Sequence, residues 1–394
     1  MTLTGRAGLG SATWRRLLVL GGGAVVIGTD AYIVAGLLPD MAAGLGASEA
    51  AAGQTVTAFA LTYALLSPVL AAATARLPRH RLLVVGLGVL AVANLAVALA
   101  GNLGVAMLAR IVAGAGAALY TPTAISVSAG LVPESRRGLA LSVVPGGLTV
   151  ATVLGVPLGT VVGQQFSWRV TLAGVSALAV LALVAVLVAV PATPLEPAVP
   201  LRDRLLAIRR RGVPVTLAVT VLGVGGSYAV YTYASSVLQR GLGVAAGAVS
   251  LLLFAYGLGA IAGTVLAGLG VDRFGPRRTL LAAFVIEVLA LALLWALGLG
   301  GGPGRSWPAA VVAVAWGAGT WMQAPPQQAR LIASAPQLGR LLLALNASAI
   351  YVGIGLGGVV GGLAVRGPGV GPLPLVGALI GAAALAALLL SSDP

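Results

Sequence analysis

Residues 246–299 read AGAVSLLLFAYGLGAIAGTVLAGLGVDRFGPRRTLLAAFVIEVLALALLWALGL, so that two long apolar runs flank a short basic loop. Each run has about 20 residues, the length at which an α-helix crosses the hydrocarbon core of a bilayer. The loop between the runs carries Arg273, Arg277 and Arg278. This stretch therefore predicts two successive membrane-spanning helices joined by a loop at one membrane surface.

The same pattern repeats along the whole chain of 394 residues, of which 59% are hydrophobic and only 8% charged. A soluble globular chain is closer to a quarter charged, so most of this chain needs lipid as its solvent. We expect an all-α membrane protein of about twelve transmembrane helices. The predicted spans are 16–38, 50–74, 82–101, 104–128, 138–162, 169–190, 214–237, 246–269, 279–299, 308–330, 340–364 and 372–391.

The arginines fix the expected orientation of these spans. Loops on the side of the N-terminus hold 18 of the 23 arginines, the opposite loops hold four, and Arg110 lies inside a span. Because cytoplasmic loops are enriched in Lys and Arg, both termini are predicted to be cytoplasmic. We expect a multi-pass protein of the cell inner or plasma membrane.

The composition argues against several other functions. The net charge of +14 comes from arginines in short loops between apolar runs, so we expect no nucleic-acid partner. The chain has no Lys, which a phosphate-binding P-loop requires, and no Cys. Its single histidine, His80, lies in an Arg-rich loop. We therefore predict no catalytic residues, no metal site, no cofactor and no enzyme activity.

The two halves of the chain show signs of a duplication. The stretch 71–81 resembles 268–278 at an offset of 197, and 114–122 resembles 317–325 at an offset of 203. Gly155 and Gly159 match Gly357 and Gly361 at an offset of 202. Six spans return the chain to its starting side, so the halves are expected to be related by a pseudo-two-fold axis along the membrane normal. The predicted domains are an N-terminal six-helix bundle, a cytoplasmic linker with a short amphipathic helix at 201–211, and a C-terminal six-helix bundle: 1–190, 191–213 and 214–394.

Several motifs resemble the major facilitator superfamily, and specifically its twelve-helix drug:proton antiporter branch. The loop Gly268-Leu-Gly-Val-Asp272-Arg273-Phe-Gly275-Pro-Arg277-Arg278 is similar to the family's G-x-x-x-D-R-x-G-R-[KR] loop, apart from Pro276. Arg110-Ile-Val-Ala-Gly114-Ala-Gly116 resembles the motif of the fourth helix. Gly155-Val-Pro157-Leu-Gly159, with Gly147 upstream, resembles the antiporter motif of the fifth helix. The first span, 28–39, is similar to that of bacterial sugar-efflux and chloramphenicol-resistance exporters.

This resemblance implies roles for two groups of residues. The loop residues would form a conformational latch in which Asp272 faces a helix end or an Arg of its neighbour in one state. The first-half copy of the loop has Ala75 in place of the Asp and Pro78 in place of the Gly, so the latch would be asymmetric. The helix-five glycines would let that helix approach its neighbours closely and slide, and Pro157 would weaken it locally.

Three ionisable residues are predicted to lie well inside spans: Asp30, Arg110 and Glu287. At 1.5 Å rise per residue, Asp30 and Arg110 lie about 12 and 9 Å from the outer ends of their helices, so the two side chains could meet. Pairing would favour a charged Asp30, and dehydration would favour a neutral one. The pair is thus a candidate for proton coupling, with a static ion pair as the alternative. Glu287 is on helix nine, which usually lies on the outside of this fold, and its role stays open.

Aromatic and amide side chains at mid-depth are candidates for lining a substrate cavity. Few charges and several aromatics suggest a neutral or weakly charged amphiphilic solute. Ordinary packing is the alternative for each of these residues: Tyr32, Tyr120, Tyr228, Tyr231, Trp321, Gln323, Asn346 and Tyr351.

The function that these features favour is secondary active transport by alternating access. We expect proton-coupled efflux of a small organic or drug-like molecule by a monomer in the lipid bilayer, with the small molecule and protons as its partners. The alternative with the same fold is a proton-coupled uptake symporter. An intramembrane enzyme or a receptor is a remote alternative, in which duplicated halves would have no role.

Overall fold

The computed structural model describes residues 10–191, 201–210, 212–300 and 305–391, and these are helical apart from short connections. The first half contains α1 Ser11–Tyr32, α2 Val34–Gly44, α3 Glu49–Ala73, α4 Arg79–Ala98, α5 Leu103–Gly130, η1 Glu134–Arg136, α6 Arg137–Val150, the π-helix η2 Ala151–Gly155, α7 Val156–Gln165 and α8 Trp168–Ala189. The second half contains α9 Leu201–Ile208, α10 Val213–Tyr231, α11 Ala234–Ser236, the π-helix η3 Val237–Gly241, α12 Ala246–Phe274, α13 Pro276–Leu299, α14 Ser306–Trp321, α15 Ala324–Ser334, η4 Pro336–Leu338, α16 Gly339–Arg366 and α17 Leu373–Leu390.

Ten helical stretches in the described residues are long and apolar enough to cross a membrane, if Glu134–Gln165, which comprises η1, α6, η2 and α7, is counted as one. The number is eleven if the bent pair α1 and α2 is one span. The pair bends by 49° at Ile33. The remaining expected span, 308–330, is divided between α14 and α15. Pro325 and Pro326 begin α15, where their missing N–H groups cost no intrahelical bond, and Gln327 and Arg330 make this half polar.

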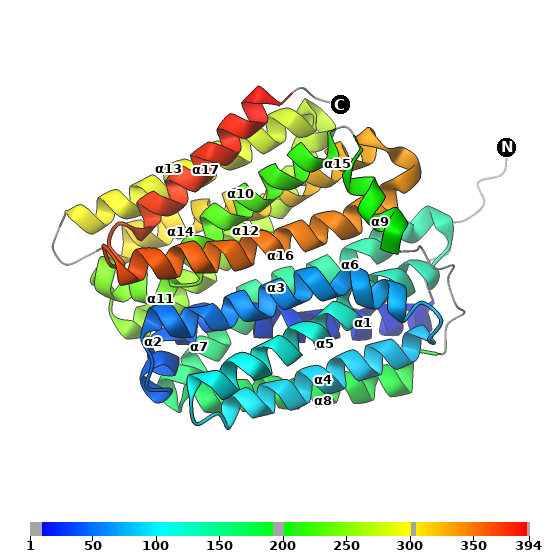
Figure 1. Cartoon of the computed structure of the whole chain (residues 1–394), viewed down its shortest axis with the longest axis horizontal. Coiled ribbons are helices and arrows are strands. Elements are labelled where there is room, and N and C mark those ends of the chain that lie inside the picture. Colours follow the sequence, from blue (N-terminus) through cyan, green and yellow to red (C-terminus); the bar gives the residue numbers. More distant parts are fainter. Residues whose placement is uncertain (1–9, 192–200, 211, 301–304, 392–394) are drawn as a thin grey trace.

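The helices form two bundles that lie side by side (Figure 1). One bundle contains α1 to α8 and the other contains α10 to α17, and each places its helices in an equivalent order. The segment between them holds α9, which falls within the helix predicted at 201–211 and packs beside α3, α10 and α16. Residues 192–200 and 211 of the predicted linker lie outside the described residues. We call the side where α1 begins and α17 ends the terminal face, and the other side the opposite face.

The bundles touch closely at the opposite face. Glu49 at the start of α3 forms a salt bridge with Arg240 of η3 and accepts a hydrogen bond from Ser236. Gln54 donates to the carbonyl of Gly358 at 3.1 Å, and Gln164 Nε2 donates to the carbonyl of Ala246 at 2.8 Å. These contacts close the space between the bundles on that side.

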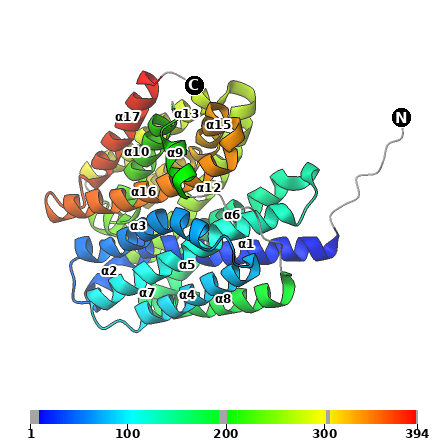
Figure 2. The same cartoon turned by 45° about the vertical axis from the view of Figure 1, so that its right-hand side comes forward.

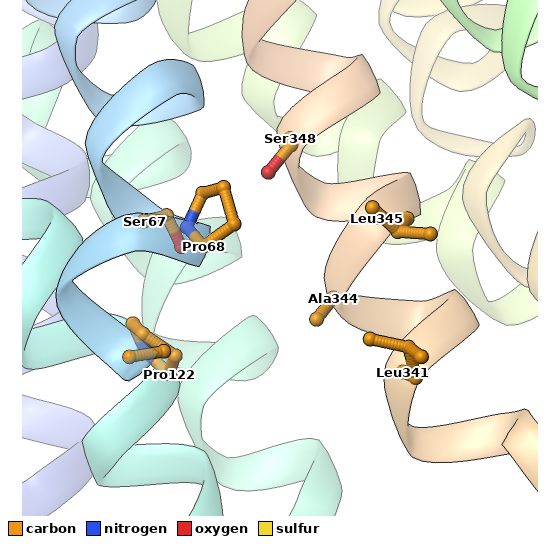
Figure 3. Close-up of a pocket in the computed structure, with 8 residues that line it drawn as sticks. Ser67, Pro68, Pro122, Leu341, Ala344, Leu345 and Ser348 are labelled. Atoms are coloured by element: carbon orange, nitrogen blue, oxygen red, sulfur yellow. The ribbon is translucent and has the colours of Figure 1, made fainter. Parts of the chain in front are cut away.

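Toward the terminal face the bundles separate. Along α12, most side chains between Val249 and Ala260 are buried, whereas between Ile261 and Leu269 only Gly263 and Ala267 are. α6 lies across from α12 and α15 in Figure 2. Only three of its 14 residues are buried, Ala140, Val144 and Gly147, so most of this helix is not covered by the other bundle. The seam between α3 and α16 also opens here into a small pocket (Figure 3). Its lining includes Ser67, Pro68, Pro122, Leu341, Leu345 and Ser348. The structure is therefore a state closed at the opposite face and open toward the terminal face.

Candidate functional site

Asp30 and Arg110 form an ion pair at the centre of the first bundle. Arg110 Nη1 donates to Asp30 Oδ1 at 2.5 Å, and both side chains are completely buried. Arg110 Nη2 also donates to the carbonyl oxygen of Asp30 at 3.3 Å, and Arg110 Nε donates to the carbonyl of Thr55 at 3.4 Å. The predicted meeting of these two residues, one on α1 and one on α5, is thus present.

The surroundings of the pair are nearly dry. The Arg110 guanidinium lies 4.5 Å from the centroid of the Phe59 ring, and Asn94 is fully buried beside Asp30. Asp30 Oδ2 has no hydrogen-bond partner in the part of the chain that the structure describes. A buried ion pair contributes little net stability, but removal of one partner leaves an uncompensated charge. Neutralisation of Asp30 would therefore leave the buried Arg110 without its counter-ion.

A cluster of aromatic side chains lies between the bundles and joins them. We call it the central aromatic cluster; it consists of Tyr32 of α1, Tyr228 and Tyr231 of α10, Tyr256 of α12, and Trp316 and Trp321 of α14. The Tyr32 ring centroid is 6.1 Å from that of Tyr228 and 6.2 Å from that of Trp321. Tyr231 and Tyr256 lie 4.8 Å apart. Four of the predicted cavity residues, Tyr32, Tyr228, Tyr231 and Trp321, are therefore brought together here. One of them, Tyr32, follows Asp30 by two positions on α1.

The cluster has several polar atoms with no partner. Among the described residues, the hydroxyls of Tyr231 and Tyr256 and the indole nitrogen of Trp321 are buried without a hydrogen bond. Buried polar groups of this kind are normally satisfied by protein or ordered water. Apolar ring faces with a few free donors are the lining expected for a small amphiphilic ligand.

Tyr351 belongs to a second contact between the bundles. Its ring stacks on that of Tyr63 at 3.7 Å and lies 6.4 Å from that of Phe59. Since Phe59 also lies under Arg110, these rings connect the ion pair to the interface between the bundles.

The other predicted cavity residues have different surroundings. The Tyr120 hydroxyl donates to the carbonyl of Leu20 at 2.9 Å, and its ring lies against Gly23 within the first bundle. Asn346 Oδ1 accepts from Thr220 at 3.0 Å within the second bundle. These contacts fit the packing alternative for both residues.

The amide nitrogen of Gln323, another predicted cavity residue, donates to Glu287 Oε2. Glu287 is fully buried on α13, the ninth predicted span, whose usual outer position made a role in a central cavity doubtful. Helix nine turns this residue toward α14 and α15, where Gly319 lets the two backbones approach closely.

The helix-five glycines all face α1, the helix that carries Asp30. A Cβ added at Gly147 would lie 2.5 Å from the carbonyl oxygen of Gly21, one at Gly155 would overlap Thr29, and one at Gly159 would overlap Ile33. Between these glycines the helix forms η2, just before Pro157, whose ring and missing N–H disrupt regular α-helix.

The second bundle repeats this packing. Gly357 and Gly361 of α16 lie against Gly225 and Ala229 of α10. The η2 segment is also where α12 crosses from the other bundle, since a Cβ at Gly257 would lie 2.6 Å from Val153 Cα.

The predicted latch residues are at the junction of α12 and α13. Gly275 has a φ of 83°, a left-handed value that favours glycine, and it turns the chain into α13. Arg277 caps the end of α17 by donating to the carbonyls of Leu388 and Ser391 at 3.2 and 2.9 Å. Gly268, Asp272, Arg273 and Arg278 are exposed, and Asp272 has no salt bridge among the described residues.

At the opposite face Gln54 Nε2 also donates to the Tyr233 hydroxyl at 3.3 Å. Several residues of these contacts were not found from the sequence: Phe59, Tyr63, Tyr256 and Trp316 in the aromatic contacts, and Glu49, Gln54, Tyr233 and Arg240 at the opposite face. Tyr256 and Trp316 were within reach, because both are aromatics at the middle of predicted spans. The opposite-face contacts were harder to predict, because the sequence shows only an acidic residue in one loop, Glu49, and an arginine in another, Arg240.

Comparison with known proteins identifies relatives over nearly the whole chain. Residues 20–248 match the family model described as Major Facilitator Superfamily. The chain is 30% identical over 370 residues to the uncharacterised MFS-type transporter YbcL of Bacillus subtilis, covering 94% of this chain and 93% of that protein. It is 29% identical to the inner membrane transport protein YdhP of Escherichia coli, covering 95% of each.

Solved structures show the same fold. A crystal structure of a D-xylose–proton symporter aligns with a TM-score of 0.78 at 20% identity, covering 97% of this chain and 98% of that one. A bacterial homolog of the human lysosomal transporter Spinster, in an inward-facing and unoccupied conformation, aligns with a TM-score of 0.68 at 20% identity, covering 97% and 95%.

Proposed function

Since the chain belongs to the Major Facilitator Superfamily, we propose that this secondary transporter is a proton-coupled exporter of a small organic molecule. The observation that carries the proposal is the buried ion pair of Asp30 and Arg110. On α1, Asp30 lies two positions before Tyr32, which belongs to the central aromatic cluster. A proton that binds Asp30 removes the charge that holds Arg110. A substrate at Tyr32 then experiences a different charge and hydration at α1, which is how the two events are coupled.

The fifth helix supports export over uptake. Its motif resembles that of the antiporter branch, and its glycines pack on the helix that carries Asp30. The alternative is a proton-coupled uptake symporter, and one structural neighbour with the same fold is described as a D-xylose–proton symporter. The free hydroxyls and aromatic faces of the cluster favour a neutral or weakly charged amphiphile as the substrate in either case.

Transport requires the two bundles to move against each other. We propose that residues 1–190 and 214–394 are the moving units, that 191–213 links them, and that one monomer suffices. Asp272 would close the latch when the terminal face closes, since the present state is open there and leaves Asp272 exposed. Following the arginine distribution, the terminal face is cytoplasmic; labelling of a cysteine at Arg209 from outside intact cells would contradict this orientation.

Proteoliposomes that hold a pH-sensitive dye test the proposal. Chloramphenicol serves as a neutral amphiphilic probe and ethidium as a cationic one. An inward gradient of a transported probe is expected to drive protons outward, as antiport requires, and proton movement inward would show symport instead. Asp30→Asn is expected to abolish the proton movement. Asp40→Asn, the same change at an exposed position of the same bent span, is the control and retains it.

Equal probe-driven proton movement in wild type and Asp30→Asn would exclude Asp30 as the coupling group. Probe flux without any proton movement in the wild type would exclude proton coupling altogether.

A further inference from the structure

A second carboxyl group is buried in the other bundle and has no part in the ion pair. Glu287 lies in the middle of α13 and is fully buried. Gly319 of α14 packs directly against the backbone at Glu287, because a Cβ at Gly319 would lie 2.7 Å from the Glu287 backbone nitrogen. Its Oε2 accepts from Gln323 Nε2, and its Oε1 has no partner in the described part of the chain.

No cation balances this carboxyl in the ranges that the structure covers. The salt bridges found there involve Asp30, Glu49 and Glu134. The titratable groups on the helices packed against α13 are Tyr228 and Tyr231 of α10, Tyr256, Asp272 and Arg273 of α12, and Arg330 of α15, whereas the described residues of α14 and α17 have none. Asp272 and Arg273 are exposed at the far end of α12, and none of these described groups forms a salt bridge with Glu287. Burial removes the hydration of an isolated carboxylate without providing a cation in return, so the neutral form is favoured.

The hydrogen bonds point to the same protonation state. The amide oxygen Oε1 of Gln323 is also buried without a partner among the described residues. Two acceptors of one acid–amide pair therefore lack a donor. A proton on Glu287 would turn its Oε1 from an acceptor into a donor, while Oε2 keeps the hydrogen bond from the amide.

A polar route leads from this pair toward the terminal face. Gln323 lies at the break between α14 and α15, and Gln327 and Arg330 follow it on the inward side of α15. Arg330 Nη1 donates to Gln327 Oε1 at 3.0 Å, and Gln327 Nε2 donates to Thr220 Oγ1 at 3.0 Å. Gln323 also follows Trp321 of the aromatic cluster by two positions.

We propose that Glu287 is a second proton-binding site, neutral in the terminal-face-open state, which exchanges its proton with water along the polar side of α15. The site goes beyond the proposed coupling role of Asp30, because it requires neither that residue nor a particular direction of transport.

Infrared difference spectroscopy of purified protein at neutral pH, in water and in deuterium oxide, tests this site without a substrate. The wild type is expected to show the C=O band of a protonated carboxyl, shifted in deuterium oxide. Glu287→Gln removes that band. Asp30→Asn and Glu134→Gln, the latter at an exposed side chain, both retain it.

Gln323→Leu provides a second measurement that keeps the carboxyl. The band is expected to remain and to move to higher frequency, because the carboxyl loses its hydrogen-bond partner. A band of full size in Glu287→Gln, no protonated carboxyl in the wild type, no shift in deuterium oxide, or an unchanged frequency in Gln323→Leu would each overturn the proposal. Loss of the band in Asp30→Asn alone would assign the proton to Asp30 and also overturn it.

Discussion

Asp30 and Arg110 are 80 positions apart in the chain and in direct contact in the fold. Their contact was predictable from the sequence, because helix rise converts a residue's distance from the span end into a depth, and an unpaired charge at that depth is costly. Neither Asp30 nor Arg110 had another partner of opposite charge well inside a predicted span of the same half, since Arg16 and Arg169 lie at span ends.

Removal of one member of this pair is expected to destabilise the protein far more than removal of both. Arg110→Gln leaves Asp30 as a buried carboxylate without its cation, at a cost of about 3–5 kcal/mol. The double variant Asp30→Asn with Arg110→Gln is expected to recover most of the loss. The midpoint of thermal unfolding of the purified, detergent-solubilised protein measures both.

The matched control is Arg137→Gln, which removes an arginine from an exposed pair with Glu134. An exposed pair is worth roughly 1 kcal/mol or less, so the midpoint should hardly change. Equal midpoints for Arg110→Gln and Arg137→Gln would show that the buried pair has no special role in stability.

The direction in which the side chains of Glu287 and Tyr256 point could not be predicted from the sequence. Both lie on helices that are apolar on every side, α13 and α12, so the hydrophobic pattern does not distinguish the side that faces lipid from the side that faces protein. Which way such a residue points is decided by its neighbours, here by the close approach that Gly319 and Gly317 permit.

At the scale of elements, the span positions were largely predictable. The predicted spans 50–74 and 169–190 correspond to α3 Glu49–Ala73 and α8 Trp168–Ala189. Length and polarity fix such boundaries, because the bilayer core sets both. The bend at Ile33 and the π-helix η2 were not predicted in position, because neighbouring helices determine where a weakened backbone departs from regular geometry.

Two adjacent glycines of α6 give opposite predictions for one substitution. At Gly147 a Cβ would lie 2.5 Å from the Gly21 carbonyl oxygen and 2.9 Å from Ala24 Cβ, whereas at Gly146 it meets nothing within 4 Å. Gly147→Ala is therefore expected to destabilise by about 1–3 kcal/mol through overpacking against α1. Gly146→Ala is expected to stabilise by about 0.5–1 kcal/mol, because glycine is a poor residue inside a helix.

The unfolding midpoints of the two variants measure this difference, and probe flux gives a second readout. Gly147→Ala should also slow transport, since α1 and α6 must keep their close contact while the bundles move. The same sign of change in both midpoints would contradict the packing of helix five on α1.

At the scale of the whole molecule, the two-bundle arrangement followed from the duplication, but the state of the molecule did not. A carrier has to populate both closed states, so its sequence encodes contacts for each. In the present state the opposite face holds its contacts: Glu49 with Arg240 and Ser236, and Gln54 with Tyr233 and Gly358. At the terminal face Asp272, which we propose as part of a latch, is exposed.

Weakening the opposite-face contacts is expected to shift the population toward the other state. Glu49→Gln removes a partly exposed ion pair, worth about 1 kcal/mol at most, so the open population of that face should rise by roughly two- to five-fold. The chain has no native Cys, so a single Thr57→Cys at the bundle interface reports the opening through its rate of thiol labelling in detergent.

Glu134→Gln makes the same charge change at the terminal face, and in the Thr57→Cys background it should leave the rate unchanged. If Glu49→Gln and Glu134→Gln label at equal rates, the Glu49 contacts do not hold the gate, and the closed face depends instead on the glycine-mediated packing of α3 on α16 and of η2 on α12.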